Sequence, residues 1–197
     1  MNNKERVWAS VEKFRAQYLP GNSYLPIDVF TIAEIDLKLD MIPFKGLTNK
    51  YRVDAALTHD FTGIFVDEES YSLLEKGPIW KQKRLRFSVA HELGHFFMHR
   101  EIAQKEKFYS LEDFCKWIRK ERYDLEQEAN EFAGRLLVPV ERLQKDCQKF
   151  ISFLENPNLI MRPPIRDGFA ERVSDAYGVT SQVIQVRLDR EGIWLVE

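Results

Sequence analysis

The sequence has few cysteines and no long apolar run. Cys115 and Cys147 are the two cysteines among 197 residues, and they do not form a Cys-x-x-Cys pair. A secreted domain held together by disulfides is therefore disfavoured, and a reducing compartment is expected. The first residues lack the apolar stretch of a signal peptide, and no segment reaches the ~18 apolar residues of a membrane helix. We expect a cytoplasmic protein without a membrane partner.

A marked excess of charge is also lacking. Lys and Arg number 29 against 31 Asp and Glu, so the formal net charge is −2. A protein that coats nucleic acid needs a basic surface, and direct nucleic-acid binding is therefore not expected. The basic run over residues 81–86 is interpreted as the solvated side of a helix.

Hydrophobic spacing divides the chain into two parts at Gly77-Pro78. The first part predicts two helices and three strands, and the second predicts helices almost throughout. Because the last two strands are joined by a hairpin-like segment, the sheet is expected to be small and largely antiparallel. The fold class is therefore α+β. The expected helices are 4–19, 27–35, 80–100, 122–137, 140–154, 167–177 and 181–188, the strands 37–44, 51–58 and 63–67, the loops 101–112 and 156–164, and an apolar tail 193–196.

Histidine is scarce, with four in the chain, and two of them belong to the segment His91-Glu92-Leu93-Gly94-His95. Residues four apart lie on one face of a helix, so both imidazoles would reach one ion at the zinc–nitrogen distance of about 2.0–2.1 Å. Glu92 projects away from this face, in the position of a general base for hydrolysis. Gly94 would permit the close approach of another backbone or of substrate. The alternative is a pair of partly buried structural histidines.

A third ligand has to come from elsewhere in the chain. The metzincin pattern needs a glycine at position 98 and a histidine at position 101, where the sequence has Met98 and Glu101. The other known solution takes a carboxylate from a following helix and leaves one coordination position open. The expected helix 122–137 is rich in acidic residues and suits this role.

Glu126 is the favoured carboxylate on that helix. It shares a stripe with Ala129 and Ala133, whose small side chains would let the helix pack closely on the motif helix. Glu128 lies on the other side of the helix axis, so one of the two is expected to bind the metal. Glu128 and Glu131 fit a solvated face better.

We place a zincin-like metallopeptidase domain at 1–155 and a small helical extension, packed on it, at 156–197.

Two blocks of sequence carry a family resemblance. Residues 86–99 read Arg-Phe-Ser-Val-Ala-His-Glu-Leu-Gly-His-Phe-Phe-Met-His, and residues 126–139 read Glu-Gln-Glu-Ala-Asn-Glu-Phe-Ala-Gly-Arg-Leu-Leu-Val-Pro. In this order and separation they resemble the ImmA/IrrE family of metallo-endopeptidases, and the similarity runs from about Pro26 to the C-terminus. The departures are Ser88, where threonine is common, and Val138, where methionine often precedes the proline.

The resemblance implies the roles of the site residues and the kind of substrate. By resemblance, His91, His95 and Glu126 are zinc ligands and Glu92 is the catalytic base. Family members typically cleave a bacterial or phage repressor of the helix-turn-helix type, which relieves repression under stress or during mobile-element transfer. About 25 residues precede the similarity, too few for the N-terminal DNA-binding domain of many members. We therefore expect a stand-alone endopeptidase with a separately encoded repressor as its protein substrate.

The role of His99 is left open by the sequence. It lies one turn further along the ligand face, where it would hydrogen-bond a ligand or donate to the transition state. It would equally serve as a helix-end histidine favoured by the helix dipole.

Two other functions compete with proteolysis. The expected helices within 170–188 have the spacing of a helix-turn-helix DNA reader, although Arg187 is the one positive charge near the bases. The chain would otherwise be a metal-binding regulatory or toxin–antitoxin module without proteolysis. Glu92 argues against that module, because a structural zinc site is usually closed by four ligands and needs no base.

Overall fold

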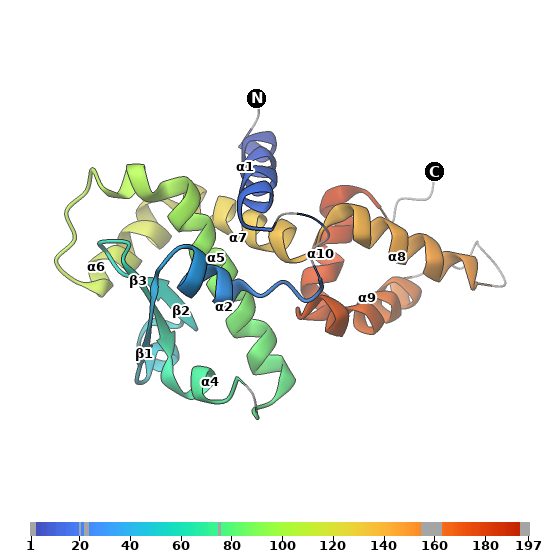
Figure 1. The fold of residues 1–197 in the computed structure, drawn as a ribbon, viewed down its shortest axis with the longest axis horizontal. Helices are drawn as coiled ribbons and strands as arrows, with labels where there is room; N and C mark the ends of the chain where they lie inside the picture. The colour runs from blue at the N-terminus through green and yellow to red at the C-terminus, as the bar shows by residue number, and fades with distance from the viewer. Residues whose placement is uncertain (1–2, 20, 22–23, 75, 155–162, 194–197) are drawn as a thin grey trace.

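A long central helix, α5 (Ile79–Ala103), organises the molecule. The fold is described by a computed structural model that covers residues 3–19, 21, 24–74, 76–154 and 163–193. The three-stranded sheet and α6 (Leu111–Lys116) lie on one side of α5, and α8 (Val140–Ser152), α9 (Pro163–Tyr177) and α10 (Ser181–Glu191) lie on the other (Figure 1). The helix α7 (Tyr123–Leu137) packs along α5, and α1 (Asn3–Tyr18) packs on α7.

The sheet confirms the expected α+β class but is mixed. Its strands β1 (Asp40–Phe44), β2 (Ala55–Leu57) and β3 (Gly63–Asp67) lie in the order β1-β3-β2. The β2–β3 pair is antiparallel, and the β1–β3 pair is parallel. The prediction of a largely antiparallel sheet was therefore wrong for one of the two strand pairings. The chain reverses between β1 and β2 and again before β3, so that β3, which enters between the other two strands, runs parallel to β1.

The first part of the chain is more helical than expected. The helix predicted at 27–35 is α2 (Val29–Thr31) continued by the π-helix η1 (Ile32–Asp36), and Asp28 caps its start by accepting from the Phe30 and Thr31 amides. The strand predicted at 51–58 is shorter, because α3 (Leu47–Tyr51) precedes it and ends at Arg52, which has a φ of 60°. A short α4 (Glu68–Ser72) follows β3, where the Asp67 side chain accepts from the Ser70 amide.

All the predicted helices of the second part are present, with ends that differ by up to four residues, and α6 and η2 are present in addition. The expected loop 101–112 is shorter, since α5 continues to Ala103 and α6 begins at Leu111. The π-helix η2 (Trp117–Glu121) then continues α6. Its apolar residues Trp117 and Ile118 are buried, as is Phe114. Most of the expected loop 156–164 and of the tail 193–196 lies outside the described residues, but Pro163 and Pro164 begin α9 and are not in a loop.

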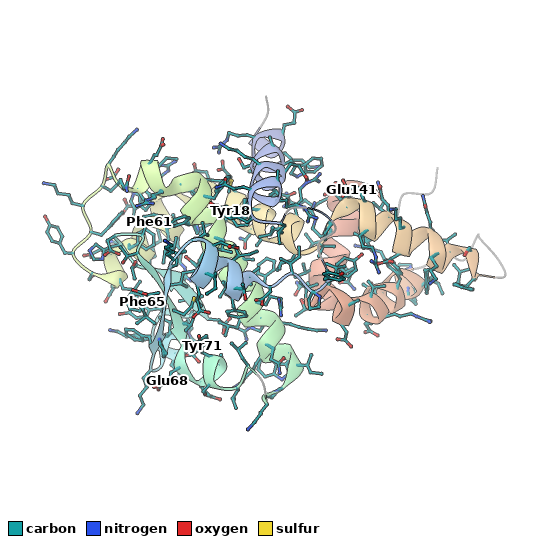
Figure 2. The ribbon with its side chains drawn as sticks, in the orientation of Figure 1. Tyr18, Phe61, Phe65, Glu68, Tyr71 and Glu141 are labelled. Carbon is teal, nitrogen blue, oxygen red and sulfur yellow. The ribbon has the colours of Figure 1, made fainter. Side chains whose placement is uncertain are left out.

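An aromatic cluster joins the three helices at the centre of the fold. The ring of Phe14 on α1 packs edge-on against Phe97 of α5 and Phe132 of α7, with centroid distances of 5.3 and 5.4 Å. Away from this cluster, Phe65 on the sheet and Glu141 on α8 mark opposite sides of α5 (Figure 2). Among the described residues, no helix combines the length and apolar character that crossing a membrane requires. The division of the chain at residue 155 stays a prediction.

Candidate metal centre

The two motif histidines face α7 across a close helix–helix contact. Gly94 lies between them in sequence, and a Cβ atom placed on it would be 3.1–3.2 Å from the Phe132 ring and Cβ. The absence of a side chain therefore lets α7 approach α5, as the sequence suggested, although the neighbour is a side chain rather than a backbone. This approach brings Glu126, in the first turns of α7, to His91 and His95.

Three ligand atoms converge at this contact. His91 Nε2 and His95 Nε2 are 2.9 Å apart, and Glu126 Oε1 lies 3.6 Å from the first and 3.3 Å from the second. Ligand atoms held about 2.0–2.1 Å from a tetrahedral ion are about 3.3–3.4 Å from one another. The triangle therefore has the size of one face of a tetrahedral site. Two imidazoles and one carboxylate are also a donor set that suits zinc.

The electrostatics favour the ligating forms of His95 and Glu126, and without a metal they favour the protonated form of His91. Burial lowers the pKa of His95 to about 3, so this imidazole is neutral near pH 7. Burial also disfavours the charged form of His91, but Glu126 and Glu92 raise its pKa. Burial of Glu126 is outweighed by hydrogen bonds from the two histidines, which hold its pKa well below the usual range. A metal would replace the protons shared among these groups, because metal ligands must be deprotonated.

Glu92 is buried beside the cluster. Its Oε2 accepts a hydrogen bond from the backbone N–H of Leu57 on β2, at 2.8 Å. Burial raises the pKa of Glu92 to about 7, with the neighbouring His91 acting in the opposite direction. A carboxylate with a pKa near neutrality both accepts and returns a proton readily. The edge strand of the sheet thus positions the expected base.

A pocket of about 140 Å³ opens onto the cluster. Its walls come from β2, α5, α6, η2 and α7, and they include Ala55, Ala56 and Ser88. Arg119, on η2, also lines this pocket and donates from Nη1 to the Tyr51 carbonyl at 2.8 Å. Arg119 was not among the predicted site residues, because η2 was not predicted from the sequence. The run of apolar residues around it, with Phe114 and Ile118, was the available signal.

The ring nitrogens that face away from Glu126 have separate partners. His91 Nδ1 lies 3.1 Å from Asn130 Oδ1 on α7. His95 Nδ1 lies 2.9 Å from His99 Nδ1, and His99 is fully buried. His99 is not among the residues that line the metal pocket. Of the roles left open for His99, which were ligand contact, donation to the transition state and a helix-end position, the distances support contact with a ligand histidine.

The expected solvated face of α7 is wrong for two of its acids. Glu128 is 4% exposed and lies 2.9 Å from His99 Nε2, and Glu131 is 8% exposed and accepts from Trp8 and Arg187. Both acids are buried because α1 and α10 cover this side of α7. The sequence pattern of α7 alone did not show these partners. Glu126 is therefore the acid of α7 that lies beside the two motif histidines, His91 and His95.

The proposed DNA-reading pair, α9 and α10, does not present its expected positive charge. Arg187 is 1% exposed and donates to Glu131 at 2.7 Å. Gln185, on the same helix, donates to Asp167 at 2.8 Å. Gly178, with a φ of 63°, does form the turn between the two helices. The spacing of a helix-turn-helix is present, but Arg187, the positive charge expected near the bases, is buried.

The fold and the cluster together define an α+β protein with a His-His-Glu group suited to one metal ion. Residues 81–189, more than half of the chain, match the family model of the IrrE N-terminal-like domain in peptidase family M78. The chain belongs to this family, which confirms the resemblance found in the sequence. Membership identifies a metallopeptidase and implies a metal. No curated protein matches the chain at a significant level.

Proposed function

We propose that the chain is a zinc-dependent endopeptidase that cleaves a protein substrate in the cytoplasm. The observation that carries the proposal is the triangle of His91 Nε2, His95 Nε2 and Glu126 Oε1, with sides of 2.9, 3.3 and 3.6 Å, beside the buried Glu92. These three side chains would hold the ion. Zinc bound there would supply Lewis-acid activation of water and of the scissile carbonyl.

Glu92 would act as general base and then as general acid. The Leu57 amide holds one of its carboxylate oxygens, which leaves the other to take a proton from the attacking water. The same carboxyl group would then protonate the leaving amine. Its raised pKa, about 7, supports both steps near neutral pH.

Arg119 would stabilise the negative charge that develops on the carbonyl oxygen. Its guanidinium lines the same pocket as Glu92 and is held in place by the Tyr51 carbonyl. A preorganised cation in a partly buried site is effective at this task. The edge strand β2 borders the pocket through Ala55 and Ala56, which supports the binding of an extended peptide along it.

We propose a helix-turn-helix repressor as the substrate, on the strength of the ImmA/IrrE resemblance. Cleavage would relieve repression under stress or during mobile-element transfer. A DNA-binding role for α9 and α10 is less well supported, because Arg187 is committed to Glu131. A metal-binding module without proteolysis gives no purpose to Glu92 at the pocket.

The first experiment compares the wild type with Glu92→Gln for zinc content and for cleavage of the repressor encoded beside its gene. We expect about one zinc per chain in both proteins and cleavage by the wild type alone, because an amide in place of the carboxylate cannot accept the proton. Zinc in both proteins with equal cleavage would contradict the role of Glu92. A wild type that takes up no divalent metal would overturn the proposal.

A further inference from the structure

A series of hydrogen-bonded and ion-paired side chains connects the candidate metal centre to the N-terminal helix. It begins at His95, whose Nδ1 lies 2.9 Å from Nδ1 of His99. It continues from His99 Nε2 to Glu128 Oε2, also at 2.9 Å. The other carboxylate oxygen of Glu128 forms an ion pair with Arg6 of α1. Three elements, α5, α7 and α1, thus meet behind one ligand histidine.

The chemistry of Glu128 fixes the direction of these hydrogen bonds. An ionised carboxylate paired with Arg6 only accepts, so Nε2 of His99 carries a hydrogen and donates. Neutral His99 then has its lone pair on Nδ1 and accepts from Nδ1–H of His95. That tautomer of His95 leaves the lone pair on Nε2, which is the atom that faces Glu126 and His91. The tautomer of a ligand histidine is commonly set in this way by the partner of its other nitrogen.

We propose that Arg6, Glu128 and His99 are positioning residues that hold His95 in its metal-binding tautomer and orientation, and that α1 is thereby part of the metal centre. The inference rests on the metal ligands of the proposed function but not on its substrate. Residues 3–18 of α1 lie outside the segment 81–189 that matches the family. Metal affinity would then depend on a helix outside that domain.

A second contact between the same two helices offers an internal comparison. Trp8, half a turn after Arg6, donates from Nε1 to Glu131 Oε1 at 2.6 Å. Glu131 is a buried acid of α7, like Glu128, but its other partners are Arg187 and Arg190 of α10 rather than a histidine. Loss of the Trp8 contact should therefore weaken the attachment of α1 without reaching the metal centre. Loss of the Arg6 contact should do both.

The test measures zinc affinity of the full chain by competition with a chromophoric chelator, and the visible spectrum of the cobalt(II)-loaded protein. The variants are Arg6→Gln and Glu128→Gln, with Trp8→Phe and Glu131→Gln as matched controls. Removing such a partner of a metal ligand weakens binding about 10- to 100-fold, and we expect this for Glu128→Gln. For Arg6→Gln we expect a smaller loss and a shifted cobalt spectrum, and for Arg6→Lys affinity close to that of the wild type.

Arg6 keeps the test informative if buried substitutions prevent folding, because its side chain is 44% exposed and Arg6→Gln should fold. The inference is overturned if Arg6→Gln matches Trp8→Phe in both zinc affinity and cobalt spectrum. It is supported if Arg6→Gln alone weakens binding while both variants unfold at similar denaturant concentrations. If the wild type binds zinc no better than a His91→Ala/His95→Ala variant, the proposed function itself fails, which is a separate outcome.

Discussion

Arg119 is the one Lys or Arg among the described residues that line the metal pocket. Its Nη1 donates to the Tyr51 carbonyl, so the guanidinium is anchored on one side and faces the pocket with the rest. Within the proposed mechanism, this arrangement makes it the natural partner for an oxygen that gains negative charge. His91 and His95 would be held by the metal and His99 contacts Glu128, so these three histidines do not offer an equivalent donor.

Replacing Arg119 by Met should therefore lower kcat by about 10²-fold, the usual effect of losing one transition-state donor. Zinc content should not change, because Arg119 is not a ligand. Steady-state cleavage of the repressor, with kcat and KM measured separately, tests this. Arg122→Met is the control, since Arg122 pairs with Asp124 at the surface outside the pocket. An unchanged kcat in Arg119→Met would remove Arg119 from the mechanism.

A second prediction at the residue scale concerns Glu131 and the pH dependence of folding stability. Burial opposes its ionisation, but Arg187 and Trp8 hold its pKa below the ordinary value of 4.5. In acid the unfolded chain binds a proton at this site before the folded chain does, so stability falls as pH drops below about 4.5. Glu131→Gln should lose part of this acid dependence. It should also lose about 1–3 kcal/mol near neutrality, because the buried Arg187 then keeps Glu191 but loses its bond to the Glu131 carboxylate.

Urea unfolding at pH values from about 3 to 7 measures both effects. Asp124→Asn is the comparison, because Asp124 pairs with Arg122 in an exposed position and such pairs contribute about 0–1 kcal/mol. Parallel stability curves for the wild type and Glu131→Gln would contradict the assignment.

At the scale of elements, the contact between α5 and α7 sets the distance between the ligands. Gly94→Ala would gain about 1 kcal/mol of helix propensity in an open position. Here the new methyl group would meet Phe132, which is fully buried and packed against Phe14 and Phe97. Overpacking costs about 1–3 kcal/mol, so we expect a net loss of stability. Zinc affinity should fall too, because a displacement of α7 by the methyl group would move Glu126 away from His91 and His95.

Gly168→Ala is the matched control for this substitution. Gly168 lies inside α9, and a Cβ atom there would have no neighbour within 4 Å. That variant should gain about 0.5–1 kcal/mol and bind zinc as the wild type does. Thermal unfolding and chelator competition on both variants decide the question. Equal stabilisation by the two substitutions would mean that α7 adjusts to the extra methyl group.

What the sequence predicted at this scale depended on local spacing. His91 and His95 lie on one helix, so their spacing alone predicted a shared ion, and Glu126 was found from a stripe on the next helix. The roles of Glu128 and Glu131 were wrong because their partners, Arg6, Trp8 and Arg187, come from segments far away in the sequence. The π-helix η2 was missed together with the short α6 before it, because neither is long enough to show a clear helical period by itself.

At the scale of the whole molecule, the strand order was beyond the sequence pattern as well. Strands of three to five residues carry little information on which neighbour they choose. The hairpin between β2 and β3 was predicted because it is local. The parallel pairing of β1 joins residues about 23 positions apart, from Asp40 to Gly63, and needed the structure.

Metal removal should lower the stability of the whole fold, because the proposed ligands join α5 to α7. A ligand present at 100 times its Kd stabilises the native state by about 2.7 kcal/mol. For a chain of this length that corresponds to a rise in Tm of about 5–10 °C. We expect a chelator to lower Tm by this amount in the wild type and to leave a His91→Ala/His95→Ala variant unchanged. Differential scanning calorimetry with and without zinc measures it, and equal shifts in both proteins would place the stabilising ion elsewhere.

The contacts of Glu131 also bear on how the protein is made. Its carboxylate receives Trp8 from α1 and Arg187 from α10, and Lys4 of α1 donates to the carbonyl of Arg190 at 2.8 Å. During synthesis α1, α5 and α7 leave the ribosome well before α10 does. Glu131 therefore lacks Arg187, and α7 lacks its full support, until α10 has emerged. A nascent chain would therefore complete the attachment of α1 through Glu131 only at that stage, whereas the three proposed metal ligands, which lie on α5 and α7, can meet before it.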